Sequence, residues 1–262
     1  MTHHATSSMT PDSNALADFG FSQRHGGAHL ARTMMLPGLR SLLAYVENPD
    51  APASAYREAI VSANCLGKRS GQTRALSYRH LADLYALDPA VGLFRSLRFF
   101  WDRDLAGQPL LALLCAQARD SLLRASAPFI LRHEAGARVT REALEAFLDN
   151  LQPDRFSAVT LTTLAQHING SWTQAGHLAG KVHKTRTRAV ATPGAVSLAL
   201  LLGYIAGLRG ELLFSSEFCQ LLDCPVASAM DLAEEASRRG WITLKRIGPV
   251  VEVTFPKRLT AP

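Results

Sequence analysis

Basic and hydroxyl side chains gather in a part of the chain that contains no carboxylate. Between Asp154 and Glu211 there is no Asp or Glu at all. Lys and Arg donate to phosphate oxygens, and such contacts supply much of the affinity of a DNA-binding module. The stretch therefore predicts a surface for a nucleic-acid backbone, the alternative being a solvated surface that happens to lack acids. Its basic residues are Arg155, Lys181, Lys184, Arg186, Arg188 and Arg209.

A helix with one uncharged polar face lies inside this stretch. Over residues 158–174 the apolar side chains follow helical spacing and predict one buried stripe. The opposite face carries Thr162, Thr163 and Gln166, with Thr173 and Gln174 nearer its end. Gln and Thr both donate and accept hydrogen bonds, so this face is suited to the edges of DNA bases.

The elements around that helix have the order of a winged helix. Thr140 is a good N-cap for a helix over 141–151, and Ser157 caps the next one. A glycine-marked passage then leads into a basic, strand-like segment over 181–190. Helix, turn, helix and basic hairpin form the winged helix-turn-helix. We assign residues 136–210 to a winged-helix-like DNA-binding unit, with Lys181, Lys184, Arg186 and Arg188 as its phosphate contacts.

The same order recurs in residues 211–262, which we predict to be a second winged helix. Helices over 217–222 and 226–239 precede two strand-like runs, 241–247 and 250–255, that flank Gly248-Pro249. This part has six Lys and Arg against seven Asp and Glu. Carboxylates directed at phosphates weaken binding, so this unit is expected to pack against another protein or against the rest of the chain. Its only candidate phosphate contacts are Lys245 and Arg246 in the wing.

The first half of the chain predicts helices without a hairpin. Residues 1–30 are polar and predict a flexible tail, and residues 31–135 predict a helical bundle domain with helices over 55–66, 70–84, 91–100 and 109–123. A basic loop at one helix start is a third candidate phosphate site, with an ordinary interhelical loop as the alternative. Its residues are Lys68, Arg69, Thr73 and Arg74.

Composition and missing motifs exclude several classes of protein. With 262 residues, 47% of them hydrophobic, the chain can bury a core, and its net charge of +6 favours an anionic partner. The longest apolar run, 195–208, is shorter than the roughly 20 residues that cross a bilayer, so we expect no membrane partner and a cytoplasmic protein. The four cysteines and nine histidines lack metal-ligand spacing. No nucleotide-binding, hydrolase or metalloprotease motif occurs, so we expect no cofactor, no metal and no catalysis.

Short motifs in the chain resemble the BrxA family of the BREX bacteriophage-defence systems. They are Asn64-x-Leu66-x-Lys68-Arg-Ser70 with Thr73-Arg74, then Leu81…Leu84-Tyr85, Ser157-Ala-Val-Thr160 and Gly176-His-Leu178. The likeness spans residues 55–255 and is that of a divergent member. It implies a small non-catalytic DNA-binding protein with helical and winged-helix parts. It also implies defence-system partners, namely a DNA methyltransferase, a large ATPase and a phosphatase-like protein.

The predicted fold is mainly α, an N-terminal helical domain followed by two winged helix-turn-helix units with short β-hairpin wings. The predicted function is a non-catalytic accessory protein of a BREX-like phage-defence system that binds double-stranded DNA. One alternative is a winged-helix transcriptional regulator, in which the N-terminal helices pair two copies as a homodimer. Another is a protein-interaction scaffold, in which both winged helices bind protein.

Overall fold

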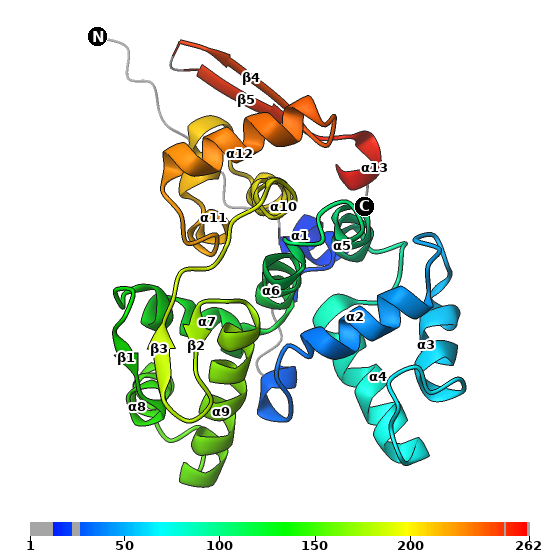
Figure 1. Cartoon of the computed structure of the whole chain (residues 1–262), viewed down its shortest axis with the longest axis vertical. Coiled ribbons are helices and arrows are strands. Elements are labelled where there is room, and N and C mark those ends of the chain that lie inside the picture. Colours follow the sequence, from blue (N-terminus) through cyan, green and yellow to red (C-terminus); the bar gives the residue numbers. More distant parts are fainter. Residues whose placement is uncertain (1–12, 23–26, 249, 261–262) are drawn as a thin grey trace.

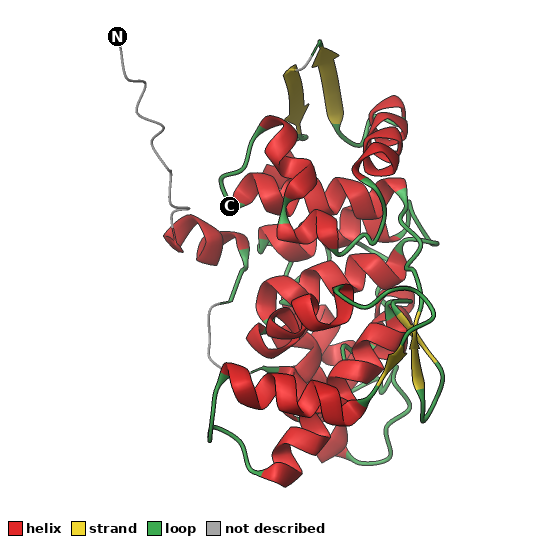
Figure 2. Ribbon diagram, turned by 90° about the vertical axis from the view of Figure 1, so that its left-hand side faces the viewer, coloured by secondary structure: helices red, strands yellow, loops and turns green. Residues whose placement is uncertain are grey.

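The chain is mainly helical with two small antiparallel sheets, which confirms the predicted fold class (Figure 1). The computed structural model describes residues 13–22, 27–248 and 250–260. Figure 2 shows the two sheets at separate places on the outside of the helical body. Each hairpin is thereby free to form a wing.

Helices from distant parts of the sequence share the core. Helix α10 packs against α5 and α6 on one side and against α11 and α12 on the other. Its leucines are fully buried between these helices. Residues on both sides of the expected boundaries at 135 and 210 therefore belong to one continuous core. The helices involved are α5 (Gly92–Trp101), α6 (Gln108–Arg119), α10 (Pro193–Ile205), α11 (Glu217–Gln220) and α12 (Val226–Arg238).

Three N-terminal helices lie beside this core on the right of Figure 1. Helix α4 packs on α3 and reaches α6. Its start is fixed by Ser70, whose hydroxyl accepts the backbone N–H of Thr73 at 3.1 Å. The three helices are α2 (Leu36–Tyr45), α3 (Ala53–Val61) and α4 (Gly71–Tyr85).

The predicted helix over 109–123 is wrong, because the chain turns at Asp120. Helix α6 ends at Arg119 and α7 (Ser121–Leu131) begins directly after it. The Asp120 carboxylate accepts the backbone N–H groups of Leu122 and Leu123, both at 3.0 Å. An N-cap in extended backbone starts a new helix, so apolar periodicity across this point spans two helices.

The first winged helix begins with α7. The order α7, β1 (Arg138–Val139), α8 (Arg141–Leu151), α9 (Ala158–Gln174), β2 (Leu178–Ala179) and β3 (Lys184–Arg186) ends in a sheet of order β1-β3-β2. Thr140 and Ser157 cap α8 and α9 as predicted. The Trp172 indole N–H donates to Ser126 Oγ at 2.8 Å and ties α9 to α7. Helix α7 thus supplies the first helix of the unit.

The second winged helix uses α10 as its first helix. The short helix η2 (Gly210–Ser215), α11 and α12 follow, and then a hairpin of β4 (Thr243–Ile247) and β5 (Val250–Thr254). Helix η2 contacts β5, so it lies where the first unit has a third strand. The chain ends its described part in α13 (Lys257–Thr260), which packs on α5.

The prediction of a flexible tail over 1–30 is wrong for the described residues in that range. Helix α1 (Ser13–Phe19) packs against α5 and α10, and Phe19 is buried. Phe21 lies edge-on to Phe218, with ring centroids 5.8 Å apart. A second piece, η1 (Ala28–Leu30), packs on α9. Burying aromatic rings outweighs the polar composition. Residues 1–12 and 23–26, also in that prediction, lie outside the described residues.

His29 anchors η1 through a Ser–His–Asp arrangement. Its Nδ1 is 2.8 Å from Asp120 Oδ2, and its Nε2 is 2.8 Å from Ser171 Oγ. The Met34 backbone N–H also donates to Ser171 Oγ. Burial raises the pKa of Asp120, but its contacts with His29 and with backbone N–H groups outweigh burial and hold it below its usual value. His29 and Ser171 are 0% exposed, so the three side chains are closed to substrates and serve packing.

Asp120→Ala should lower the free energy of unfolding by about 2–4 kcal/mol, because it removes an N-cap and leaves Nδ1 of the buried His29 without its hydrogen-bond partner. Urea unfolding measures this cost. Thr140→Ala is the matched control, since it removes a cap alone and should cost about 1 kcal/mol. Equal losses of stability in the two variants would mean that the contact between His29 and the Asp120 carboxylate does not contribute to the free energy of unfolding.

Candidate nucleic-acid interface

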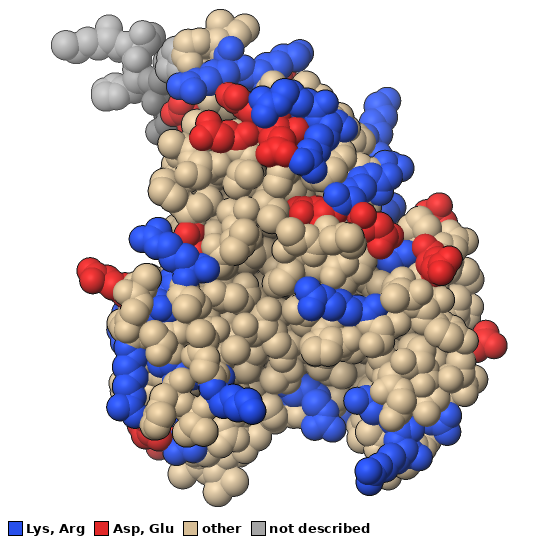
Figure 3. All heavy atoms as spheres, viewed as in Figure 1, with Lys and Arg blue, Asp and Glu red and all other residues tan. Residues whose placement is uncertain are grey.

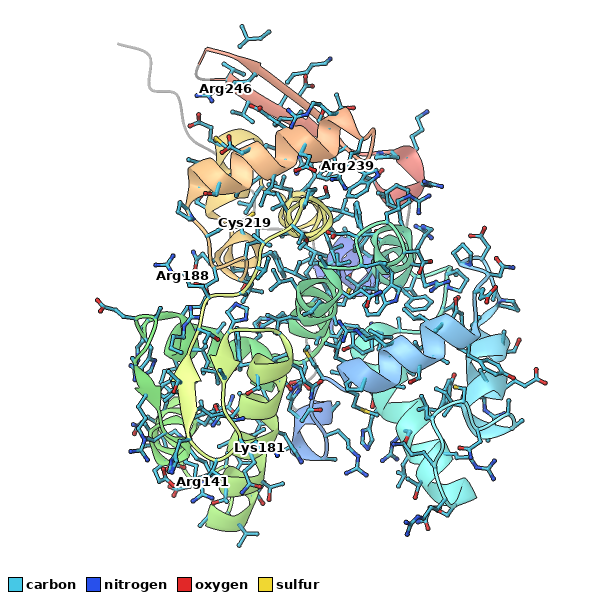
Figure 4. All side chains as sticks on the ribbon, viewed as in Figure 1. Arg141, Lys181, Arg188, Cys219, Arg239 and Arg246 are labelled. Atoms are coloured by element: carbon cyan, nitrogen blue, oxygen red, sulfur yellow. The ribbon has the colours of Figure 1, made fainter. Side chains whose placement is uncertain are left out.

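A basic groove runs between α9, the β2–β3 wing and the start of α8. It has a volume of about 540 Å³. Four cationic side chains line it from three elements, and among the described residues Glu142 is its one acidic lining residue. Figure 4 shows Arg141 and Lys181 close together at this end of the molecule. The four cationic residues are Arg138, Arg141, Lys181 and Lys184.

The wing is held in a tight turn that places Lys181 at the groove. Gly180 has a φ of +95°, and a Cβ there would lie 2.1 Å from the His183 carbonyl oxygen, so glycine is required. Lys184 Nζ donates to the Gly180 carbonyl oxygen at 2.6 Å. Burial lowers the pKa of Lys184. Lys184 therefore braces the wing, while Lys181 is exposed at its tip.

Strand β1 and the start of α8 bring two arginines that the sequence analysis missed. Arg138 pairs with Thr185 across the sheet, and its guanidinium lies 3.0 Å from His183 Nδ1 in the wing. Arg141 begins α8 and forms ion pairs with Glu142 and Glu145, each at 2.9 Å. Both precede Asp154, outside the acid-free stretch. Their signal in the sequence was the pair of arginines on either side of the Thr140 cap.

Helix α9 contributes one exposed polar side chain to the groove. Gln166 is exposed there, whereas Thr162 and Thr163 are half-buried. The Thr163 hydroxyl donates to the Val159 carbonyl oxygen at 3.1 Å, which leaves its lone pairs for a ligand. Of the three predicted base-reading residues, Gln166 is the best placed for a hydrogen bond in the groove.

The second half of α9 is covered by the N-terminal segment, contrary to prediction. Gln174 accepts the Leu36 backbone N–H at 2.8 Å and donates to Thr33 Oγ1 at 2.9 Å. At Gly170 an added Cβ would lie 2.8 Å from Thr33 Cγ2. The face that carries Gln174 therefore binds the chain itself.

Arg186 was predicted to contact phosphate, and this is wrong because its side chain is buried. It is 3% exposed and forms a two-point ion pair with Asp223 at 2.7 and 2.8 Å. Asp223 lies in the turn between α11 and α12, and it also accepts the Ala189 backbone N–H. Burial raises the pKa of Asp223, but Arg186 outweighs burial and lowers it. Arg186 thus joins the two winged helices.

The other predicted contacts lie away from the groove. Arg188 is exposed beside α11, well apart from Lys181 and Arg141 (Figure 4). Lys245 and Arg246 are exposed on the β4–β5 hairpin at the opposite end of the long axis (Figure 1). The third candidate site lies on the far side of the α2–α4 cluster, where Arg69 is exposed and the Thr73 hydroxyl pairs with Ser70. The members of that site are Lys68, Arg69, Thr73 and Arg74.

Lys and Arg side chains, blue in Figure 3, follow this distribution, with one group at the lower left over the first winged helix and another at the lower right over α3 and α4.

Comparison with protein-family models gives no match, and comparison with curated proteins gives none either. Among the described residues, no three His, Cys, Asp or Glu side chains gather in a way that could hold a metal ion. No helix in that same part of the chain has the length and apolar character needed to cross a membrane.

A buried histidine makes the junction of the two winged helices sensitive to acid. His177 is buried, and its Nε2 lies 3.0 Å from the Leu221 carbonyl oxygen, to which it donates. Burial lowers the pKa of His177 to about 4, and the positive charge of Arg186 acts in the same direction. A lowered pKa means that the unfolded chain takes up the proton more readily than the folded one.

Stability should therefore fall as the pH drops from about 6.5, the usual value for an unfolded histidine, towards 4. The slope due to His177 approaches about 1.4 kcal/mol per pH unit in this window. Urea unfolding of the wild type and of His177→Gln at several pH values measures it. Burial also lowers the pKa of His80 and His167, so a smaller slope should remain in the variant. Identical slopes in the two proteins would contradict the assignment to His177.

Proposed function

We propose that the chain binds double-stranded DNA through its first winged helix and performs no catalysis. The observation that carries this is the groove between α9, the wing and α8. There, Arg138, Arg141 and Lys181 stand on three elements around Gln166. Cations spread over a helix and a wing suit the two phosphate strands that border a DNA groove.

Most of the affinity in this proposal is electrostatic. Among the described residues of α9, Gln166 is exposed in the groove and Thr162 and Thr163 are half-buried, while the N-terminal segment covers the second half of the helix, so few uncharged polar groups are placed to reach bases. Affinity should therefore depend strongly on salt and weakly on sequence. This favours a DNA-binding accessory protein over a regulator that reads one operator.

The resemblance to the BrxA family supplies the cellular setting of this proposal. The chain would act as an accessory protein of a BREX-like phage-defence system in the cytoplasm. It would work beside a methyltransferase, an ATPase and a phosphatase-like protein. The motif Asn64 to Ser70 that carries the resemblance lies on the α3–α4 turn.

The test is the binding of the purified protein to a labelled mixed-sequence duplex at about 50 and 200 mM salt. We expect binding at the lower salt and a steep loss at the higher. Absence of binding at the lower salt would overturn the proposal and leave the scaffold alternative. Equal affinity at both salts would rule out a phosphate-dominated contact.

A further inference from the structure

The exposed face of the second winged helix carries the wrong charge for DNA. Helix α12 buries Ala229, Ala233 and Ala236 against the core. Its opposite face presents Asp231 and Glu234, with Arg238 one turn further on, all exposed, so the face carries more acid than base. In a DNA-binding winged helix this second helix of the helix-turn-helix lies in the major groove. Carboxylates on it repel phosphates, so this face does not suit a DNA groove.

The wing of the same unit has the opposite charge and an apolar tip. Lys245 and Arg246 are exposed on β4, and Glu252 on β5 lies 4.0 Å from Lys245 Nζ, so the wing carries a net positive charge. Next to them Ile247 is 80% exposed and Val250 is 66% exposed. Ile247 and Val250 are paired across the hairpin, so they form one contiguous apolar tip, and contiguous exposed apolar surface is a feature of contact sites. Figure 3 shows red and blue side chains together over α12 and blue ones on the hairpin beside it.

We propose that a second copy of this chain covers this surface, as a two-fold symmetric dimer. A two-fold interface places one patch on the same patch of its partner, so the patch must complement itself. An acidic helix face beside a basic, apolar-tipped wing meets this condition. The wing of each copy would lie along α12 of the other, and Arg246 would face Asp231 and Glu234. Ile247 and Val250 would be buried in the contact.

Such a dimer would place its two DNA grooves far apart. In one copy the β4–β5 hairpin and the basic groove lie at opposite ends of the long axis (Figures 1 and 4). Joining two hairpin ends leaves the two grooves at the outer ends of the pair. The dimer would then hold two separate duplexes rather than two adjacent half-sites of one. This consequence rests on the proposed function, whereas the dimer itself does not.

The test is a charge exchange, followed by sedimentation equilibrium without DNA. One variant carries Lys245→Glu with Arg246→Glu, and the other carries Asp231→Arg with Glu234→Arg. We expect the wild type to be mostly dimeric at about 100 µM, which corresponds to a dimer Kd in the micromolar range. Each variant alone should associate at least about tenfold more weakly, because both of its wing–helix contacts are repulsive. An equimolar mixture should regain the dimer, because both contacts are then attractive.

A matched control carries Lys68→Glu with Arg69→Glu, which reverses two positive charges outside the proposed interface and should leave the dimer intact. Far-ultraviolet circular dichroism shows that each variant is folded, and recovery in the mixture shows it independently. A monomeric wild type at about 100 µM, reversals without effect, or a mixture that stays monomeric would each overturn the dimer. Capture of one labelled duplex by another, immobilised duplex then tests the bridging. A dimer that binds single duplexes but captures none would contradict the opposed grooves, and one that binds none would contradict the proposed function instead.

Discussion

Replacing Arg138, Arg141 and Lys181 together by alanine should weaken binding to a short DNA duplex by roughly 100-fold at moderate salt. These cations line the groove from β1, α8 and the wing. Each cation that no longer contacts a phosphate should also reduce the steepness of log affinity plotted against log salt concentration by about 0.9. A fluorescence-anisotropy titration at several salt concentrations measures both quantities. Lys184 is left unchanged, because it braces the wing through the Gly180 carbonyl oxygen.

Two control variants distinguish DNA binding in the groove from attraction by the net charge of the protein. Alanine at Arg238, Lys245 and Lys257 removes the same number of charges from exposed positions of the second unit. This triple variant should keep its affinity for a duplex that holds one protein. Glu142→Gln should raise affinity, because Glu142 is the acid of the groove. Equal losses of affinity in the two triple variants would show that DNA binds by net charge and not in the groove.

Arg186→Ala should be the most destabilising of the single substitutions considered, by about 3–5 kcal/mol. The side chain is buried and meets both Asp223 oxygens, and its Nε also donates to the Ile130 carbonyl oxygen at 3.2 Å. Its removal leaves a half-buried carboxylate without its cation. Urea unfolding monitored by tryptophan fluorescence gives the cost.

Arg188→Ala is the matched control for this effect. It lies two residues further along the chain, after the end of β3, and is exposed, so it should change stability by less than about 0.5 kcal/mol. A double variant, Arg186→Met with Asp223→Leu, should recover part of the stability, because neither charge is then left buried alone. Equal stability of the Arg186→Ala and Arg188→Ala variants would contradict the claim that Arg186 stabilises the junction of the two winged helices.

The sequence by itself determined the local elements, because their signals are local. Thr140 and Ser157 cap α8 and α9, and the predicted ranges of both helices match the structure. Apolar spacing likewise predicted the buried stripe of α9, where Leu164, Ile168 and Trp172 are fully buried. A cap or a helical period is set by residues within one or two turns, so one chain is enough to find it.

Only the tertiary structure decided which charges face solvent. Arg186 and Arg188 look alike in the sequence, yet one is buried against Asp223 from 37 residues further on and the other is exposed. Arg138 reached the groove through strand pairing with β3, and His29 was drawn into the core by Asp120 and Ser171. Each of these outcomes depends on a partner distant in sequence. The free energy of such a contact exists only once the fold has brought the two residues together. Counting charges along the chain therefore could not tell which of these side chains would be buried and which exposed.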